Sequence, residues 1–245
     1  MSPTVTWTPR GLFVGLAAAA LSLSACATSG VPSDAATTVL SFEELDCGDC
    51  GDHMARAMIG VDGVYKTKFD KRRAELTIVA SPKLDVFAIA QKNKPAGEEW
   101  SLALGAGKGR YKAWAKAPEQ ADVLEIAVDG ADVADLAAHL AKGKVTLFDF
   151  SAKWCEPCRE LDAHLVEELK ARPDLAYRKL DIGDWDTPLA ARYMKGVGQL
   201  PYVIVFDKAG SRAGDLSGLD LPALDALLDK AGSTAAGAPA EKKAP

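Results

Sequence analysis

The chain has 245 residues, enough for one large or two small domains. Its net charge is -5 and only 7% of its residues are aromatic, which argues against a nucleic-acid surface or a polybasic membrane patch. The five cysteines are more informative. Cys26 stands alone, whereas Cys47 with Cys50 and Cys155 with Cys158 form two Cys-x-x-Cys pairs. Such pairs indicate metal binding, redox chemistry or both.

Residues 1–25 are typical of a secretion signal. An arginine precedes an apolar run over residues 11–23, which is too short for a comfortable membrane span. The run ends in Leu-Ser-Ala-Cys, which is similar to the lipobox of bacterial lipoproteins and implies lipidation of Cys26; an ordinary secretory signal with an incidental cysteine is the alternative. We therefore expect a lipid anchor at the periplasmic face of the cell envelope, where disulfides persist. Ala27 after the cysteine favours the outer membrane in a Gram-negative cell.

The rest of the chain divides into two folded blocks between a tether and a tail. Residues 26–37 are small and polar, as in a flexible tether. Residues 232–245 are rich in Ala, Gly, Pro and Lys, which predicts a disordered tail. The two blocks between them, residues 38–117 and 122–231, have the hydrophobic periodicity of folded domains.

The pattern of the first block predicts the order β-α-β-β-α-β. The expected elements are a strand at 39–45, a helix from the first Cys-x-x-Cys motif through Met58, strands at 64–71 and 73–80, a helix opened by Pro82, and a strand within 100–114. Met54 and Met58 fall at helical spacing, so we expect them in the core.

The Cys47 and Cys50 motif and residues 63–65 resemble the heavy-metal-associated domain. That resemblance implies a small α+β domain of ferredoxin-like βαββαβ fold, whose two thiolates would hold a soft ion such as Cu(I). Asp46 or His53 would add a harder ligand and bring Zn(II) within reach. The alternative is a local disulfide, which the same pair closes easily in an oxidising compartment.

The second block is predicted to be α/β, in the order β-α-β-α-β-α-β-β-α. The expected elements are strands at 123–128, 145–150, 177–182 and 202–206, an edge strand, and helices at 131–141, from the second Cys-x-x-Cys motif to 171, at 188–195 and at 222–231. The strand at 145–150 is almost continuously apolar, as a central buried strand should be. This order places helices on both faces of a mixed sheet.

The Cys155-x-x-Cys158 motif stands where this central strand ends and a helix begins. Free N–H groups and the helix dipole stabilise a thiolate there, so Cys155 is the predicted nucleophile toward a substrate disulfide. One turn later, Cys158 is placed to resolve the mixed disulfide. Trp154 would cover one side of the thiol. The sequence thus predicts thiol–disulfide exchange.

Residues 148–158 follow the active-site pattern of the thioredoxin family, with Glu156 in place of Gly. The resemblance implies a thioredoxin fold, protein disulfide substrates, an upstream thiol electron donor and no cofactor for this domain. It also implies roles for three further residues. Asp149 would be a buried acid that accepts the proton of the resolving thiol, Lys179 the lysine that pairs with it, and Pro201 a cis-proline that faces the disulfide and holds substrate backbone.

Three functions remain open at this stage. The first is a membrane-anchored thiol:disulfide oxidoreductase that acts as a reductant. The second is a soft-metal binding or delivery protein whose metal-site thiols the second domain keeps reduced. The third treats the first domain as an interaction module. A direct transfer from Cys155 to the pair Cys47 and Cys50 would join the first two.

Overall fold

The computed structural model describes residues 30–233. The predicted signal peptide, Cys26 and the tail beyond residue 233 lie outside the described residues. Among the helices that are described, none combines the length and apolarity needed to cross a bilayer. Both folded domains belong to one compact unit, which begins at Pro32.

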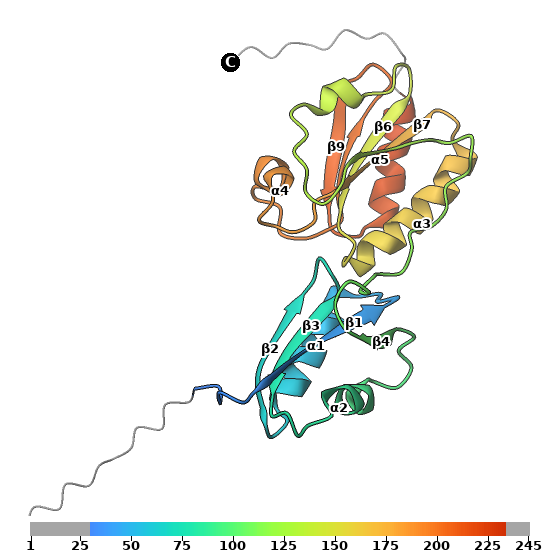
Figure 1. The fold of residues 1–245 in the computed structure, drawn as a ribbon. Coiled ribbons are helices and arrows are strands. Elements are labelled where there is room, and N and C mark those ends of the chain that lie inside the picture. Colours follow the sequence, from blue (N-terminus) through green and yellow to red (C-terminus); the bar gives the residue numbers. More distant parts are fainter. Residues whose placement is uncertain (1–29, 234–245) are drawn as a thin grey trace, which may run out of the picture. The chain divides into compact units, whose positions relative to one another are not determined.

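The amino-terminal domain is an antiparallel sheet of the order β2-β3-β1-β4 with two helices (Figure 1). Its elements are β1 (Ala36–Glu43), α1 (Gly48–Ile59), β2 (Val64–Asp70), β3 (Glu75–Ala80), α2 (Val86–Asn93) and β4 (Ser101–Leu104). The expected α+β fold of βαββαβ order is confirmed. β1 begins at Ala36, inside the segment expected to be a tether.

The core of this domain lies between the sheet and its helices. Alternate residues of β1, Leu40 and Phe42, are fully buried, and Met54 and Met58 of α1 pack in the same cluster. The two methionines are therefore core residues, as their helical spacing predicted. Trp100 closes the cluster, with its ring centroid 5.0 Å from that of Phe42.

The second helix of the domain starts later than its proline suggested. Pro82 lies in a turn, and α2 begins at Val86. The Asp85 carboxylate accepts a hydrogen bond from the Ala88 N–H at 3.0 Å, which satisfies a free donor of the first turn. The side-chain cap therefore fixes the helix start, rather than the proline.

The carboxy-terminal domain is a five-stranded mixed sheet of the order β5-β7-β6-β8-β9 (Figure 1). Its elements are β5 (Asp122–Ala127), the 3-10 helix η1 (Leu136–His139), β6 (Val145–Ser151), α3 (Glu156–Ala171), β7 (Leu175–Asp181), α4 (Pro188–Tyr193), β8 (Tyr202–Phe206), β9 (Arg212–Ser217) and α5 (Leu221–Ser233). β5, β7 and β6 are parallel to one another. β8 is antiparallel to β6, and β9 is antiparallel to β8.

Strand β6 is the central strand, and every one of its residues is buried. Leu147 packs in the cluster that α3 and α5 form on one face of the sheet. Phe148 and Phe150 pack in the cluster that includes η1 and α4. The predicted sheet with helices on both faces is confirmed, and burial on both faces explains the nearly continuous apolar run.

The prediction of a helix at 131–141 is wrong. Within this segment only Leu136–His139 is helical, and it forms a single 3-10 turn. Asp135 caps this short turn by accepting a hydrogen bond from the Ala137 N–H at 2.8 Å. Leu140 is already extended, which ends the turn. The segment still buries Val133 and Leu136, so the apolar spacing that suggested a longer helix is satisfied by a loop and one turn.

Candidate active site

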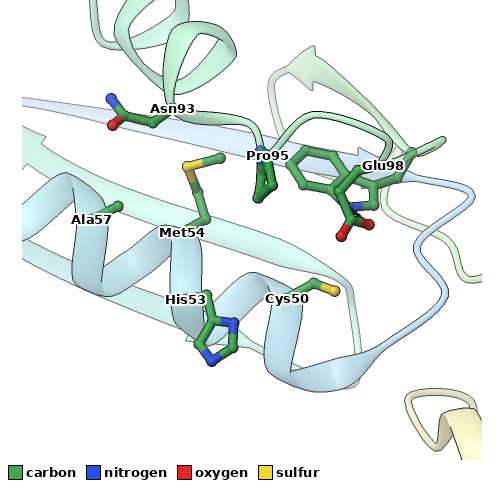
Figure 2. Close-up of a pocket in the computed structure, with 8 residues that line it drawn as sticks. Cys50, His53, Met54, Ala57, Asn93, Pro95 and Glu98 are labelled. Carbon is green, nitrogen blue, oxygen red and sulfur yellow. Dashed lines mark hydrogen bonds between the residues drawn. The ribbon is translucent and has the colours of Figure 1, made fainter.

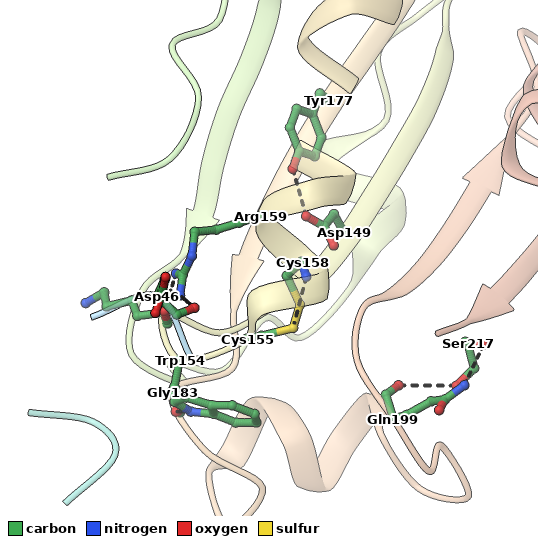
Figure 3. Close-up of a disulfide and its surroundings, with 11 residues drawn as sticks. Asp46, Asp149, Trp154, Cys155, Cys158, Arg159, Tyr177, Gly183, Gln199 and Ser217 are labelled. Atoms are coloured by element: carbon green, nitrogen blue, oxygen red, sulfur yellow. Dashed lines mark hydrogen bonds between the residues drawn. A yellow bond between two sulfur atoms is a disulfide. The ribbon is translucent and has the colours of Figure 1, made fainter. Parts of the chain in front are cut away.

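Cys155 is the N-cap of α3, directly after the central strand. Its Sγ accepts a hydrogen bond from the Cys158 N–H at 3.2 Å, and Pro157 lies in the first turn of the helix. The two sulfurs form a disulfide, and both residues are buried (Figure 3). The helix N-terminus that stabilises a Cys155 thiolate after reduction is therefore in place.

A pocket of about 360 Å³ opens beside this disulfide. Trp154, Cys155 and Leu200 are among the residues that line it. The Leu200–Pro201 peptide bond is cis, as the resemblance implied for Pro201. The Trp154 indole is fixed by a 2.8 Å hydrogen bond from its Nε1 to the Gly183 carbonyl. The predicted nucleophile and the proline loop thus meet at one hollow in the surface.

Asp149 lies behind the disulfide, fully buried between Cys158 and Tyr177 (Figure 3). Tyr177 Oη lies 2.7 Å from Asp149 Oδ2, whereas Oδ1 has no hydrogen-bond partner. Burial raises the pKa of Asp149 to about 7, against the opposing effects of the Tyr177 hydrogen bond and the positive charge of Lys179. An acid with this pKa exchanges a proton readily near neutral pH.

Lys179 contacts a different acid from the one expected. Its Nζ lies 2.6 Å from Asp162 Oδ1, and Asp162 is only 1% exposed. Tyr177 Oη lies 3.0 Å from that same Oδ1, so the tyrosine stands between the two carboxyl groups. The lysine influences Asp149 by its charge, while its ion pair is with Asp162.

The position of Tyr177 gives Asp149 a way to hold a proton. A phenol has one proton, so Tyr177 donates to only one of its two carboxylate neighbours at a time. When Asp149 is protonated, it can donate to Tyr177 Oη while Tyr177 donates to Asp162. Sequence reasoning missed both Tyr177 and Asp162. A signal existed for Asp162, because it stands in the buried stripe of α3 that Cys158 and Leu161 begin.

The amino-terminal cysteine pair has the same local geometry as the active-site pair. Cys47 is the N-cap of α1, its Sγ accepts from the Cys50 N–H at 3.1 Å, and the two sulfurs form a disulfide. The potential ligand atoms of Asp46, Cys47 and Cys50 all lie within 4.8 Å of one another. His53 is not in this cluster. It lines, with Cys50, an apolar pocket of about 170 Å³ next to α1 (Figure 2).

Comparison with known proteins identifies the second domain. A family model described as thioredoxin matches residues 128–230. The thioredoxin of Geodia cydonium is 31% identical over 88 residues, and the match covers 32% of this chain and 83% of that protein. The chain belongs to the thioredoxin family. Its Cys155 and Cys158 are the Cys-x-x-Cys pair of that family, in a domain that the matched region nearly spans.

Other relatives are larger than the matched region. The chloroplastic thioredoxin-like protein HCF164 of Oryza sativa subsp. japonica is 33% identical over 99 residues, which is 36% of this chain and 37% of that protein. Thioredoxin-2 of Pyricularia oryzae is 33% identical over 94 residues, 38% of this chain and 53% of that protein. The chain therefore spans about a third to a half of the length of these two curated relatives. The oxidised structure of thioredoxin O1 from Arabidopsis thaliana is 28% identical, with a TM-score of 0.31. That match covers 36% of this chain and 78% of the other.

Proposed function

We propose that the protein is a thiol:disulfide oxidoreductase that reduces disulfides of protein substrates. The observation that carries this proposal is one arrangement: Cys155 caps α3, the cis-Pro201 loop shares its pocket, and a buried acid of raised pKa lies behind Cys158. These are the groups that a two-step exchange needs: a stabilised nucleophile, a surface for substrate backbone, and a base for the resolving thiol.

The reaction begins with the reduced pair. The Cys155 thiolate attacks one sulfur of the substrate disulfide, a Cys155–substrate bond forms, and the other substrate sulfur leaves as a thiolate. Asp149 then accepts the Cys158 proton, and the Cys158 thiolate attacks Cys155 Sγ. The substrate leaves as a dithiol and the Cys155–Cys158 disulfide remains, so two electrons have passed to the substrate. A dithiol donor returns the enzyme to the reduced state.

Insulin reduction coupled to a dithiol donor tests this function. We expect turnover by the wild-type chain, and accumulation of a mixed disulfide between insulin and Cys155 in the Cys158→Ser variant, because the resolving thiol is then missing. The reduction potential of the pair tests the direction: a value near about -270 mV supports a reductant, whereas one near about -120 mV indicates an oxidant. Absence of both turnover and the trapped species would contradict the proposal.

We also propose that the enzyme works outside the cytoplasm on a lipid anchor at Cys26. The lipobox-like sequence at residues 23–26 supports the anchor, and disulfides at both cysteine pairs suit an oxidising compartment. Labelled palmitate should enter the wild-type protein, and the label should be absent from a Cys26→Ala variant that is expressed to the same level. Equal labelling of the two proteins would show that the anchor is elsewhere.

A second candidate function is soft-metal binding by the amino-terminal domain. It is supported by the cluster of Asp46, Cys47 and Cys50, which offers two thiolates and one carboxylate once the disulfide is reduced. Titration of the reduced Cys155→Ser/Cys158→Ser protein with Cu(I) should give one ion per chain, and that ion should be lost when Cys47→Ser is added. Zn(II) binding that depends on Asp46 would instead identify the harder ion. Unchanged stoichiometry in the Cys47→Ser protein would exclude the site.

A further inference from the structure

The segment that carries Cys47 lies directly against the segment that precedes Cys155. The Gly48 N–H donates a hydrogen bond to the Trp154 carbonyl at 2.8 Å. A Cβ added at Gly48 would lie only 3.0 Å from that oxygen and 3.1 Å from Trp154 Cβ. The two backbones therefore approach closely, and a side chain at this position would push Trp154 away by a few tenths of an ångström, which favours glycine.

Arg159 of α3 forms hydrogen bonds with both of these segments. Its guanidinium donates to the carbonyl oxygens of Asp46 and Lys153 (Figure 3). The guanidinium carbon lies 5.6 Å and 5.8 Å from the ring centroids of Tyr111 and Trp114, close enough for cation–π attraction. One cation thus bridges the residue before Cys47 and the loop before Cys155.

An ion pair also joins the two domains away from the cysteines. Arg72 Nη2 lies 2.8 Å from Asp129 Oδ2, and Arg72 Nε also donates to Asp129. On the cysteine side, Lys71 pairs with Asp52 at 3.1 Å and lies 5.7 Å from the centroid of the Trp154 ring. The face that carries Cys47 is consequently held at several points, and the contact does not depend on a single hydrogen bond.

The two cysteine pairs share one pocket, which one cysteine of each pair lines. Cys47 lines the pocket that Cys155 and Leu200 also line. Cys50 lines the other pocket, beside α2, which Figure 2 shows with Met54 and Pro95. Of the two amino-terminal sulfurs, Cys47 is therefore the one that faces the nucleophile.

We propose that the Cys47–Cys50 disulfide is a built-in substrate of the Cys155/Cys158 dithiol, an inference that rests on the proposed reductase function. The Cys155 thiolate attacks Cys47 Sγ, the Cys47–Cys50 bond breaks, and Cys50 leaves as a thiolate that takes a proton from solvent. Cys158, deprotonated by Asp149, then attacks Cys155 Sγ and expels Cys47.

The products of this transfer are a Cys155–Cys158 disulfide and a Cys47/Cys50 dithiol. Two electrons move from one pair to the other, and an external dithiol supplies them to the active site. Cys47 is a good leaving group in the second step, because the N-terminus of α1 and the Cys50 N–H stabilise its thiolate. The amino-terminal pair thereby becomes available as a dithiol, either to a protein disulfide or to a thiol-binding metal.

Pairs of single cysteines test the predicted geometry in the full chain with Cys26→Ser. The variant Cys50→Ser/Cys158→Ser retains only Cys47 and Cys155, and its matched control Cys47→Ser/Cys158→Ser retains only Cys50 and Cys155. With diamide at low protein concentration, we expect the first to form its intramolecular disulfide about tenfold or more faster than the control, since proximity sets the effective concentration. Peptide mass spectrometry identifies the bond. Equal rates, or no Cys47–Cys155 bond, would overturn the proposal.

The transfer itself is measured by the rate at which dithiothreitol reduces the Cys47–Cys50 disulfide, followed by alkylation and mass spectrometry. In Cys155→Ser this rate should fall about tenfold or more relative to wild type, and the wild-type rate per chain should not depend on protein concentration. Equal rates in the two proteins contradict the transfer. Insulin reduction by the wild type is assayed in parallel: insulin activity without transfer refutes only the built-in substrate, whereas loss of insulin activity refutes the reductase function.

Discussion

Replacement of Asp149 by Asn should lower the rate of insulin reduction by about 100-fold at neutral pH, the low end of what a positioned base contributes. Asn keeps the size and can still accept from Tyr177 Oη, but it cannot take the proton of Cys158. The slow step becomes resolution of the mixed disulfide, so the Cys155–insulin intermediate should accumulate in rapid-quench samples. An Asn variant with wild-type turnover would show that water serves as the base.

The pH profile separates a proton-transfer role from a structural one. Because the pKa of Asp149 is about 7, the wild-type rate should rise with pH through that value as the carboxylate forms. The Asn variant lacks this rise. Tyr177→Phe is the matched control, since it removes the hydrogen bond that lowers the pKa of Asp149 and should shift the same rise to higher pH. A rise at unchanged pH in all three proteins would contradict the assignment.

The same ionisation makes stability depend on pH, with a sign that can be derived. The folded-state pKa of Asp149 is raised from 3.8 to about 7, so the folded protein binds the proton more tightly than the unfolded chain does. The stabilisation from the neutral acid is complete below the unfolded pKa and is lost as pH rises to about 7. Urea unfolding of the oxidised protein measures this effect. As pH rises over this range, the free energy of unfolding of the wild type should decrease, relative to that of Asp149→Asn, by at most about 1.4 kcal/mol per pH unit. A constant difference would show that Asp149 does not titrate there.

Local motifs in the sequence were sufficient to predict much of the site. The helix N-terminus at Cys155 follows from a strand, a Cys-x-x-Cys spacing and Pro157, all within a few residues. The cis bond at Pro201 was implied by the family resemblance and is present. Element order was predictable for the same reason, because each strand and most helices have their own hydrophobic period.

The parts that the sequence did not predict depend on contacts between distant residues. Lys179 was expected beside Asp149, but its neighbour on α3 is Asp162, and nothing local to β7 distinguishes the two partners. The contact of Gly48 with Trp154 joins residues more than a hundred positions apart and depends on how the two domains pack. The expected helix at 131–141 failed because an apolar period is also satisfied by an irregular segment that buries Val133 and Leu136.

Asp162→Ala should be the most destabilising change in the buried polar network, by about 3–5 kcal/mol, the usual cost when one partner of a buried ion pair is removed. Asp162 accepts from the Ala115 N–H at 3.0 Å, pairs with Lys179 at 2.6 Å and lies 3.0 Å from Tyr177 Oη. Alanine leaves the Ala115 N–H and the Lys179 ammonium without this acceptor, whereas Tyr177 can still donate to Asp149. Urea unfolding at neutral pH measures the loss.

Two further variants decide whether the charge or the packing carries this effect. Glu167→Ala, on the same helix, removes an acid that is 68% exposed and pairs with Lys170, so it should cost no more than about 0.5 kcal/mol. Adding Lys179→Met to Asp162→Ala removes the unpaired ammonium, and it should recover part of the lost stability. The two charges act on the pKa of Asp149 in opposite directions, since Lys179 lowers it and Asp162 raises it, so the double variant removes both effects together. If the double variant is no more stable than Asp162→Ala, the cost comes from the unsatisfied Ala115 N–H and the lost packing rather than from the unpaired charge of Lys179.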